Sequence, residues 1–500
     1  MPALTPRPHG PAPAAGPTGR ARITVLGCGT SPGETVPPAA REALGRATLL
    51  LGARRHLTEH PAAAAVPPGT RRVVLGPLAP ALDAVAERLR GGDGQVVVLA
   101  SGDPGFFGIV RALAERFGAE ALDVHPSVPS VARAFARTGL TWDDAAVVSA
   151  HGRELRTAVN VCRAHPKTAV LTGPGAGPAE LGAALRGTDR LLVVGTDLGG
   201  PGERLERVTP EQAAARNWPA VSVVLCLDPD PARWLSPRPA ALAGPPRPGD
   251  APTGGAGRPP GPHPGWALPE DAFEHRDSMI TKAEVRALAL ARLAPRPGTL
   301  VWDIGSGSGS VAVECARLGS AVTAVERDPE QVRRITANAA AHGVPVTVVH
   351  GSAPEALPEL TASGGAPDAV FVGGGGIDAV AACAAVARRA VVVTLAAIDR
   401  VPAARAALGA AGLAVDGVLL QSSRLAPLPG DAWRLAATNP VFVLWGVRDH
   451  PPAPGPGPVP EPDHAGGWAR ADAPPAPATP PVPHHPRQHR DHTAPPGEQP

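Results

Sequence analysis

Residues Val301–Ser310 read VWDIGSGSGS, and this stretch decides the fold class of the chain. Its first four residues, 301–304, form a largely apolar run that is typical of a buried strand, and residues 311–317 have the composition of a helix. Glycine recurs at alternate positions between them, at Gly305, Gly307 and Gly309. Because glycine lets a turn pass close to a ligand, the stretch predicts a strand, a binding loop and a helix of a parallel α/β domain.

An acid about twenty residues further on strengthens this prediction. Glu326 ends the run AVTAVE, where a second strand would present its carboxylate to ribose hydroxyls. The dinucleotide fingerprint G-x-G-x-x-G requires glycine at its sixth position, and Ser310 stands there, which disfavours an adenine dinucleotide. With Asp303 before the first glycine, the stretch instead resembles the first motif of Rossmann-like methyltransferases that bind S-adenosylmethionine. A purely structural glycine turn is the remaining alternative.

Proline and glycine are unevenly distributed along the 500 residues. The chain has 64 Pro and 58 Gly, and residues 1–20, 229–265 and 448–500 hold a disproportionate share of them. These segments have few bulky apolar side chains, too few to offset the entropy cost of ordering. We therefore expect a disordered tail, a linker and a second disordered tail, which leave two globular bodies at 21–228 and 266–447.

The charge balance and the cysteines argue against several classes of protein. A net charge of +2 gives no basis for a protein that coats nucleic acid, so we expect no nucleic-acid partner. Lys167 and Lys282 are the only lysines, and arginine forks suit a small ligand rich in carboxylates. The five cysteines lie far apart without a C-x-x-C pair, which predicts neither a zinc site nor a disulfide framework.

Apolar runs long enough for a membrane span are absent from the sequence, and the Pro-rich N-terminus lacks the apolar core of a signal peptide. We expect a cytoplasmic chain without a membrane partner, and a homo-oligomer. Four histidines near the end could bind a metal, although a solvated polar tail is the simpler interpretation; they are His484, His485, His489 and His492.

The first body alternates strand-like and helix-like segments, which predicts an α/β fold. Apolar runs of strand length lie at 23–26, 96–100, 145–149, 169–172, 191–194 and 221–227. Segments of helical composition lie at 39–47, 78–90, 108–117 and 131–138. Two strands lead into glycine-rich loops, at Leu26 and Leu99, and α/β sheets bind ligands at such strand ends, although each loop alone could be an ordinary turn.

Five segments of this body carry a specific resemblance. They are the opening G-x-G loop, ATLLLGARRHL at 47–57, LASGDPGFFGI at 99–109, HPSVPSVARAF at 125–135 and VVSAHGR at 147–153. Together they resemble the tetrapyrrole methylases of corrin biosynthesis, and among them the branch that methylates a late precorrin. The resemblance implies a two-lobed α/β domain with S-adenosylmethionine in the cleft. The cofactor positions carried over are Gly27, Gly29, Ser101, Gly102, Asp103, Pro104, Ser127 and Ser130.

A helix start precedes the glycine loop of the second body. Thr281 and Glu284 have the spacing of a capping box, and Lys282 then falls at the first helical position. A cation there opposes the helix dipole, so this lysine is placed either by chance or for a ligand. Further along the chain, Asp328–Pro329 predicts the start of another helix and Gly343 predicts its end.

Strand and glycine loop coincide twice more in the second body. Residues 346–349 lead to GSAPEAL, and residues 369–372 lead to four glycines, 373–376. Many methyltransferases place an acid where Ser352 stands, so we expect the adenine contact to come from backbone. Nucleic-acid amino-methyltransferases carry an Asn-Pro-Pro-aromatic motif where this chain has the four glycines, which argues against base methylation. Their N–H groups could instead bind an acetate carboxylate.

The segments FEHRDSMITKAEVRALAL, WDIGSGSGSVAVE, GSAPEAL and DAVFVGGGG, in that order, are similar to the decarboxylating methyltransferase partner of the corrin pathway. Both partners in one chain resemble the family of bifunctional, decarboxylating precorrin C5,15-methyltransferases of cobalamin biosynthesis. The resemblance implies a Rossmann-like domain that follows a tetrapyrrole methylase domain, and two S-adenosylmethionine-dependent methylations of a tetrapyrrole, at carbons 5 and 15, with loss of one acetate carboxylate. The implied cofactor positions are Thr281, Gly305, Ser306, Gly307, Ser308, Gly309, Glu326, Ser352 and Ala353, and the implied substrate positions are Lys282, Gly373, Gly374, Gly375 and Gly376.

Two other functions remain open from the sequence. Relatives of the first body act on RNA, so a ribosomal-RNA methyltransferase is one alternative, although such a protein usually has a basic face. A non-catalytic S-adenosylmethionine sensor would keep the glycine loops without a substrate pocket.

Overall fold

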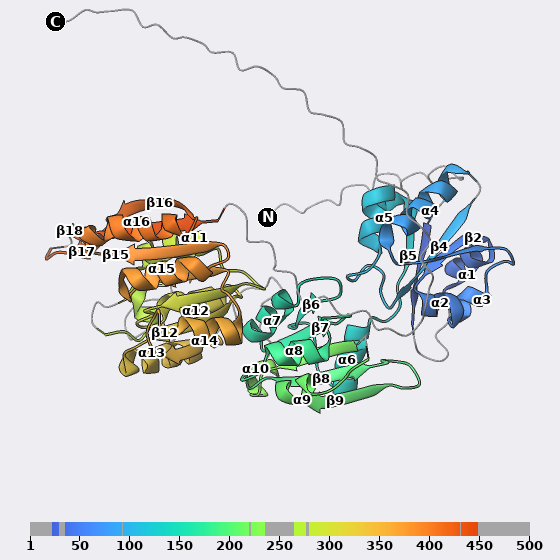
Figure 1. Cartoon of the computed structure of the whole chain (residues 1–500), viewed down its shortest axis with the longest axis horizontal. Coiled ribbons are helices and arrows are strands. Elements are labelled where there is room, and N and C mark those ends of the chain that lie inside the picture. Colours follow the sequence, from blue (N-terminus) through green and yellow to red (C-terminus); the bar gives the residue numbers. More distant parts are fainter. Residues whose placement is uncertain are drawn as a thin grey trace, which may run out of the picture. The chain divides into compact units, whose positions relative to one another are not determined.

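The computed structural model describes residues 23–29, 36–92, 94–219, 222–235, 265–276, 280–430 and 432–448 (Figure 1). The predicted tail 1–20, the predicted tail 448–500 except Arg448, and most of the predicted linker lie outside these residues. The short helix α10, Ala232–Leu235, falls within the range predicted as linker. The described strands form three sheets and a hairpin, and helices alternate with them along the chain. The chain therefore has the α/β fold class that its sequence predicts.

The first lobe is a parallel sheet of five strands in the order β3-β2-β4-β1-β5. Its strands are β1 Ile23–Cys28, β2 Ala47–Gly52, β3 Arg71–Val74, β4 Gln95–Ser101 and β5 Leu122–His125. Its helices are α1 Pro38–Gly45, α2 Arg54–Thr58, α3 Pro61–Ala64, α4 Leu78–Arg90, α5 Val110–Phe117 and the 3-10 turn η1 Ala119–Ala121. Alternate side chains of β1 and β4 enter two separate cores, one shared with α1 to α3 and the other with α4 and α5.

The second lobe is a mixed sheet in the order β6-β7-β10-β8-β9, in which only β6 and β7 run parallel. Its strands are β6 Ala146–Ser149, β7 Lys167–Leu171, β8 Leu191–Thr196, β9 Arg204–Val208 and β10 Ser222–Leu227. Its helices are α6 Ser130–Thr138, α7 Leu155–Ala164, α8 Pro178–Ala184 and α9 Pro210–Ala214. Helix α6 packs on one face, and α7 and α8 pack on the other.

Four strands of the first body, β2, β3, β5 and β9, were not among the predicted strands. β3 and β5 are short and carry polar side chains that are mostly not buried, so their sequences lack an apolar run. The helix predicted at 39–47 ends at Gly45, because Ala47 already pairs with Gln95 as the first residue of β2.

The second body is a seven-stranded sheet in the order β13-β12-β11-β14-β15-β19-β16. Its strands are β11 Leu300–Ile304, β12 Ala321–Glu326, β13 Thr347–His350, β14 Ala369–Val372, β15 Ala390–Leu395, β16 Ala414–Leu420 and β19 Val441–Val447, and β17 Ser423–Pro427 pairs with β18 Trp433–Ala437 as a hairpin. Its helices are η2 Glu270–Ala272, α11 Ala283–Leu293, α12 Ser310–Arg317, α13 Pro329–Ala341, α14 Leu357–Gly364, α15 Gly376–Val386, η3 Ile398–Arg400 and α16 Val401–Ala410. The first five strands are parallel, and the strand order reverses between β11 and β14, which is where such sheets bind ligands.

The predicted helix boundaries in the second body are confirmed at α13 and wrong at α11. Asp328 caps α13 through the Glu330 N–H, and the helix ends before Gly343. Helix α11, however, has Lys282 at its N-cap and no side-chain cap, so Thr281 and Glu284 form no capping box. The first-turn N–H of Ala283 donates instead to Glu270, because Arg424 holds Glu270 beside the helix end and binds Glu284 as well.

Ion pairs and hydrogen bonds join α7 of the first body to the second body. Arg156 binds both oxygens of Asp368, at 2.8 and 2.9 Å, and also the Ala366 carbonyl. The buried Asn160 donates to the Gly298 carbonyl at 3.0 Å. These contacts fall at the amino ends of β11 and β14, the edge opposite the glycine loops.

All five cysteines are buried and none forms a disulfide, as the sequence predicts. Within the described residues, no three His, Cys, Asp or Glu side chains gather as a metal site. The four C-terminal histidines lie outside those residues. No helix in the described part of the chain is both long and apolar enough to cross a membrane.

Candidate functional sites

Three loops of the first body meet at the carboxyl ends of β1, β4 and β5. The Gly102 N–H donates to the Cys28 carbonyl at 3.0 Å, and the Gly102 carbonyl accepts from the Ser127 N–H at 3.1 Å. Gly27 leaves no room for a side chain, because a Cβ there would lie 2.1 Å from the Gly102 oxygen and 2.5 Å from the Ser127 nitrogen. Predicted cofactor positions from three separate segments are therefore neighbours.

The loop after β4 is tightly folded by its own polar groups. The Asp103 carboxylate accepts from the Gly105 N–H at 2.8 Å, and the Pro104 carbonyl accepts from the Val110 N–H at 3.3 Å. Ser130, the first residue of α6, also lies beside this loop: its nitrogen is 3.7 Å from a Cβ built on Gly102. All eight predicted positions of the first body lie on these loops or in the ends of the strands and the helix that flank them.

A polar group that the sequence analysis missed supports Ser101 at the end of β4. The Arg55 guanidinium donates to the Ser101 hydroxyl at 2.8 Å, and His56 Nε2 lies 3.2 Å from the same oxygen. Burial, with the nearby cations of Arg55 and His60, lowers the pKa of His56 to about 4. His56 is therefore neutral, and because Arg55 Nε donates to its Nε2 at 3.4 Å, this nitrogen acts as an acceptor for the Ser101 hydroxyl as well. Both residues lie in the segment ATLLLGARRHL, 47–57. Its pattern is an apolar run, which gives no sign that Arg55 and His56 contact Ser101.

In the second body, Asp303 anchors the loop between β11 and α12. Its Oδ2 accepts from the Ser306 hydroxyl at 2.7 Å and from the Ala312 N–H at 2.9 Å. Its Oδ1 is buried with no hydrogen-bond partner among the described residues. Burial raises the pKa of Asp303 to about 6, against the opposing effect of those two hydrogen bonds.

Glu326 accepts three backbone hydrogen bonds at the end of β12. One oxygen accepts from the Gly307 N–H at 2.8 Å, and the other accepts from the N–H groups of Arg327 and Asp328 at 2.9 and 3.0 Å. The predicted ribose ligand thus also holds the glycine loop against the start of α13. Asn338 supports the same loop, because its amide donates to the Ser308 carbonyl at 2.8 Å.

The four-glycine loop lies against the first glycine loop, since a Cβ on Gly305 would be 2.7 Å from Gly374. The prediction that all four glycines offer N–H groups to a substrate is wrong for two of them. Gly373 and Gly374 both donate to the Ile304 carbonyl, at 2.9 and 3.3 Å, because the chain leaving β14 folds back over the end of β11. Among the described residues, the N–H groups of Gly375 and Gly376 have no acceptor.

The remaining predicted residues of the second body differ in whether they contact the glycine loops. Ala353 borders the four-glycine loop, its carbonyl 3.8 Å from a Cβ built on Gly375. The Ser352 hydroxyl donates to Glu355 at 2.8 Å, so this side chain is occupied by a neighbour. The Thr281 carbonyl accepts from Arg286 at 2.6 Å, and within the described residues Lys282 forms no hydrogen bond or ion pair with either glycine loop.

The two glycine loops of the second body fit a nucleoside ligand. Gly307 and Gly376 have φ angles of 55° and 83°, and no atom lies within 4 Å of a Cβ built on either. Their backbone therefore borders open space, while Gly309 is closed off by Ile335 at 3.1 Å. A buried acid, a carboxylate at the next strand end and open glycine backbone are the features expected of such a site.

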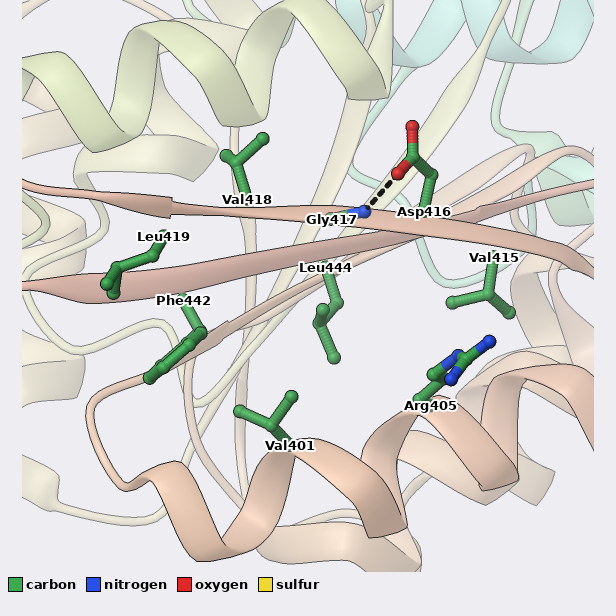
Figure 2. A pocket seen from close by; sticks show the side chains of 9 residues that line it. All are labelled: Val401, Arg405, Val415, Asp416, Gly417, Val418, Leu419, Phe442 and Leu444. Atoms are coloured by element: carbon green, nitrogen blue, oxygen red, sulfur yellow. Dashed lines mark hydrogen bonds between the residues drawn. The ribbon is translucent and has the colours of Figure 1, made fainter. Parts of the chain in front are cut away.

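A surface pocket of about 360 Å³ lies elsewhere in the second body (Figure 2). α16, β16 and β19 line it with apolar side chains, and Arg405 and Asp416 lie at one end (Figure 2). The Asp416 carboxylate accepts from the neighbouring Gly417 N–H at 2.8 Å. None of the predicted site residues lines this pocket, so the glycine loops remain the candidate site.

Comparisons with known proteins divide the chain in the same way. The family described as Tetrapyrrole (Corrin/Porphyrin) Methylases matches residues 22–214, and the Precorrin methyltransferase domain matches residues 271–438. The chain is similar to precorrin-6Y C(5,15)-methyltransferase (decarboxylating) of Sinorhizobium sp, with 37% identity over 361 residues, 71% of this chain and 78% of that protein.

Two shorter relatives are similar to parts of the chain. A probable cobalt-precorrin-6B C(15)-methyltransferase (decarboxylating) of Pyrobaculum calidifontis is 36% identical over 187 residues, 35% of this chain and 93% of that protein. The cobalt-precorrin-7 C(5)-methyltransferase of Salmonella typhimurium is 35% identical over 187 residues, 37% of this chain and 88% of that protein.

Proposed function

The chain belongs to the family of decarboxylating precorrin-6Y C5,15-methyltransferases, and from this premise we propose that its two bodies divide the reaction between two S-adenosylmethionine sites. The enzyme is a methyltransferase of cobalamin biosynthesis that acts on a late precorrin at carbons 5 and 15, with decarboxylation. In the proposal the first body, 21–228, methylates carbon 5. The second, 266–447, methylates carbon 15 and removes the acetate carboxylate.

One observation carries this division: each body has its own cluster of glycine loops at the carboxyl edge of a parallel sheet. The loops of Gly27, Gly102 and Ser127 meet in the first body, and those of Gly305 and Gly374 meet in the second. The two family descriptions match the two bodies separately. The two shorter relatives, one named for carbon 5 and the other for carbon 15, each cover little more than a third of the chain.

When bound, S-adenosylmethionine supplies an electrophilic methyl group. In the second body, Glu326 would accept from the ribose hydroxyls, and Asp303 would hold the Ser306 and Ala312 groups so that the loop keeps its shape. In the first body, the Ser101 hydroxyl oxygen, held by Arg55 and His56, would accept from an N–H donor. Such fixed groups align carbon, methyl and sulfur, which can contribute several kcal/mol to catalysis.

The chemistry demands no strong base in the first step. The ring carbon is enamine-like and already nucleophilic, so the loops of each body would only have to hold it in line with the methyl group that the cofactor would supply. In the second body the carboxylate of the acetate side chain would then leave as carbon dioxide, the electron pair of the broken carbon–carbon bond would pass into the ring, and the remaining CH2 group would take up a proton from water to become a methyl group. The N–H groups of Gly375 and Gly376, at the start of α15, would hold the acetate carboxylate before it leaves.

The test is incubation of the intact chain with methyl-labelled S-adenosylmethionine and either a tetrapyrrole extract or ribosomal RNA. Mass spectrometry should show a precorrin product with two methyl gains and one loss of carbon dioxide. Label in RNA would support a ribosomal-RNA methyltransferase instead. Cofactor binding without label in either substrate would support a sensor. Light scattering of the same preparation tests the expected homo-oligomer.

A further inference from the structure

Phe107 is the most unusual residue near the first cofactor loops. Its backbone φ is 56°, a left-handed conformation that is an outlier for a bulky side chain. Its side chain is also 42% exposed, although the chain has only 7 Phe and no Tyr. Strain and solvent exposure both cost stability, so packing of the folded chain does not explain this residue. Strained residues of this kind occur mainly at functional sites.

The loop that carries Phe107 is rigid enough to impose this conformation. Gly108 has no room for a side chain, because a Cβ there would lie 2.3 Å from the Pro104 carbonyl oxygen. Phe106 turns inward and packs against the core of the second lobe. Its neighbour Phe107 is left facing outward, with the two rings edge to face at 5.0 Å.

A cation from the other lobe lies over the same ring. The guanidinium of Arg153 is 5.6 Å from the centre of the Phe107 ring. Arg153 is held in place by its own turn, because its backbone N–H donates to the Ala150 carbonyl at 3.3 Å and His151, two residues earlier, lies against Gly173. No carboxylate within the described part of the chain forms an ion pair with Arg153. An arginine that stacks on an aromatic ring keeps its N–H edge available for a carboxylate.

A second apolar side chain is exposed beside the cofactor loop. Val128, in the loop after β5, is 51% exposed, and its carbonyl oxygen lies 3.5 Å from a Cβ built on Gly102. Phe107 and Val128 therefore border the loop Gly102–Pro104 with apolar surface, and Arg153 adds a cation that has no ion-pair partner among the described residues. A ligand that complements them has a flat apolar face and carboxylates at its rim.

We infer that Phe107 and Arg153 bind the tetrapyrrole in the first body: the Phe107 ring packs on the face of the macrocycle, and Arg153 binds one of its peripheral carboxylates. The inference rests on the proposed function, which supplies a substrate of that shape and charge. It makes both residues determinants of substrate specificity at the first site and assigns neither a role in binding S-adenosylmethionine.

Replacement of Phe107 by glycine separates this role from a structural one, because glycine adopts a φ of 56° without strain. The Phe107→Gly chain should melt at the same temperature as wild type or higher. Its KM for the tetrapyrrole in carbon 5 methylation should rise about tenfold or more, the loss expected of one buried aromatic contact. Its KM for S-adenosylmethionine, and carbon 15 methylation, should not change.

Ala294→Gly is the matched control, because Ala294 also has a left-handed φ, 42°, but lies in the second body at the end of α11. It should equal wild type in every KM. Arg153→Gln should raise the KM for the tetrapyrrole, and Arg153→Lys should recover only part of the loss, since lysine lacks the planar fork.

An unchanged tetrapyrrole KM in Phe107→Gly and Arg153→Gln would overturn the inference, and so would a fall in the melting temperature of Phe107→Gly like that of a core truncation. A wild-type chain that binds S-adenosylmethionine but methylates no tetrapyrrole would instead contradict the proposed function.

Discussion

The carboxylate of Glu326 accepts a 2.8 Å hydrogen bond from the N–H of Gly307, 19 residues earlier in the chain. The same carboxylate accepts from Arg327 and Asp328 at the start of the next helix. A single side chain, the proposed ribose ligand, therefore also joins the first glycine loop to the end of β12.

Glu326→Ala should weaken cofactor binding at the second site by tenfold or more and should also lower the melting temperature. The ribose loses a charge-assisted pair of hydrogen bonds, each worth about 1.5–3 kcal/mol, and three backbone N–H groups lose their acceptor. Calorimetry and thermal unfolding measure the two effects. Glu359→Ala removes an exposed carboxylate from α14 and should change neither. A lower melting temperature with unchanged cofactor affinity would limit Glu326 to a structural role.

Calorimetry of the intact chain should give two S-adenosylmethionine sites per chain. Gly27→Ala should reduce this number to one, because its methyl group would lie 2.1 Å from the Gly102 oxygen and force the three loops of the first body apart. Gly45→Ala, in α1 of the same lobe with nothing within 4 Å, is the control and should retain both sites. A wild-type stoichiometry of one would remove one body from the proposed division.

Asp303→Asn should change the pH dependence of stability in a defined direction. Burial raises the pKa of folded Asp303 from 3.8 to about 6, so between these values the folded state binds more protons than the unfolded state. Asp303 therefore destabilises the fold increasingly as pH rises through this window, by on the order of 2–3 kcal/mol.

Asparagine keeps the shape without the charge, so the stability of Asp303→Asn relative to wild type should increase from pH 4 to pH 7. Chemical denaturation across this range measures it, and Asp399→Asn, an exposed carboxylate on η3, is the control. A difference from wild type that does not vary with pH would contradict the assignment.

Arg424→Met should destabilise the chain at neutral pH and have less effect in acid. The hydrogen bond from Arg424 lowers the pKa of Glu270 from 4.5 to about 2. The stability from this pairing is therefore present above pH 4.5 and is lost as the pH falls toward 2. Arg424 is 38% exposed, so solvent screening limits the effect at pH 7 to about 1 kcal/mol. Arg434→Met, exposed on β18, should show no such pH-dependent difference when both are compared by urea unfolding.

Limited proteolysis tests the proposed linker at 229–265, where we expect cleavage near Arg247 or Arg258. The two halves should nevertheless elute together in gel filtration, because Arg156 and Asn160 bind the second body through Asp368 and Gly298. Arg156→Ala should promote their separation, whereas Arg111→Ala, exposed on α5, should not. Separation of the wild-type halves would mean that these contacts contribute little to the association of the two bodies.

The α/β architecture could be predicted because most of the buried strands of both bodies are apolar runs, and several of them lead into glycine loops. The stretch Val301–Ser310 formed the expected strand, loop and helix. The short strands β3 and β5 could not be found in the same way, because pairing with a neighbour, and not an apolar pattern, makes them strands.

Only part of each candidate site could be predicted, because a sequence does not show long-range hydrogen bonds. Glycine loops are visible in the sequence, but the partner of each backbone N–H is not. The Gly373 and Gly374 N–H groups bind the Ile304 carbonyl across a strand crossover, and the capping of α11 depends on Arg424, 140 residues from Glu284. Arg153 and Phe107 come from different lobes, so no local spacing could have paired them.

The burial of all five cysteines has a practical consequence. Burial raises the pKa of the Cys383 thiol to about 12 and holds that of Cys315 well above its ordinary value, so neither forms the thiolate that alkylating reagents require, and all five thiols are shielded from reagents in solution. The native chain should be almost silent toward thiol-reactive dyes, and each label acquired should report a local opening of the fold. A cysteine introduced on the surface, for example in place of Val128, would then carry a fluorophore beside the proposed cofactor loops of the first body. None of the native cysteines would have to be replaced.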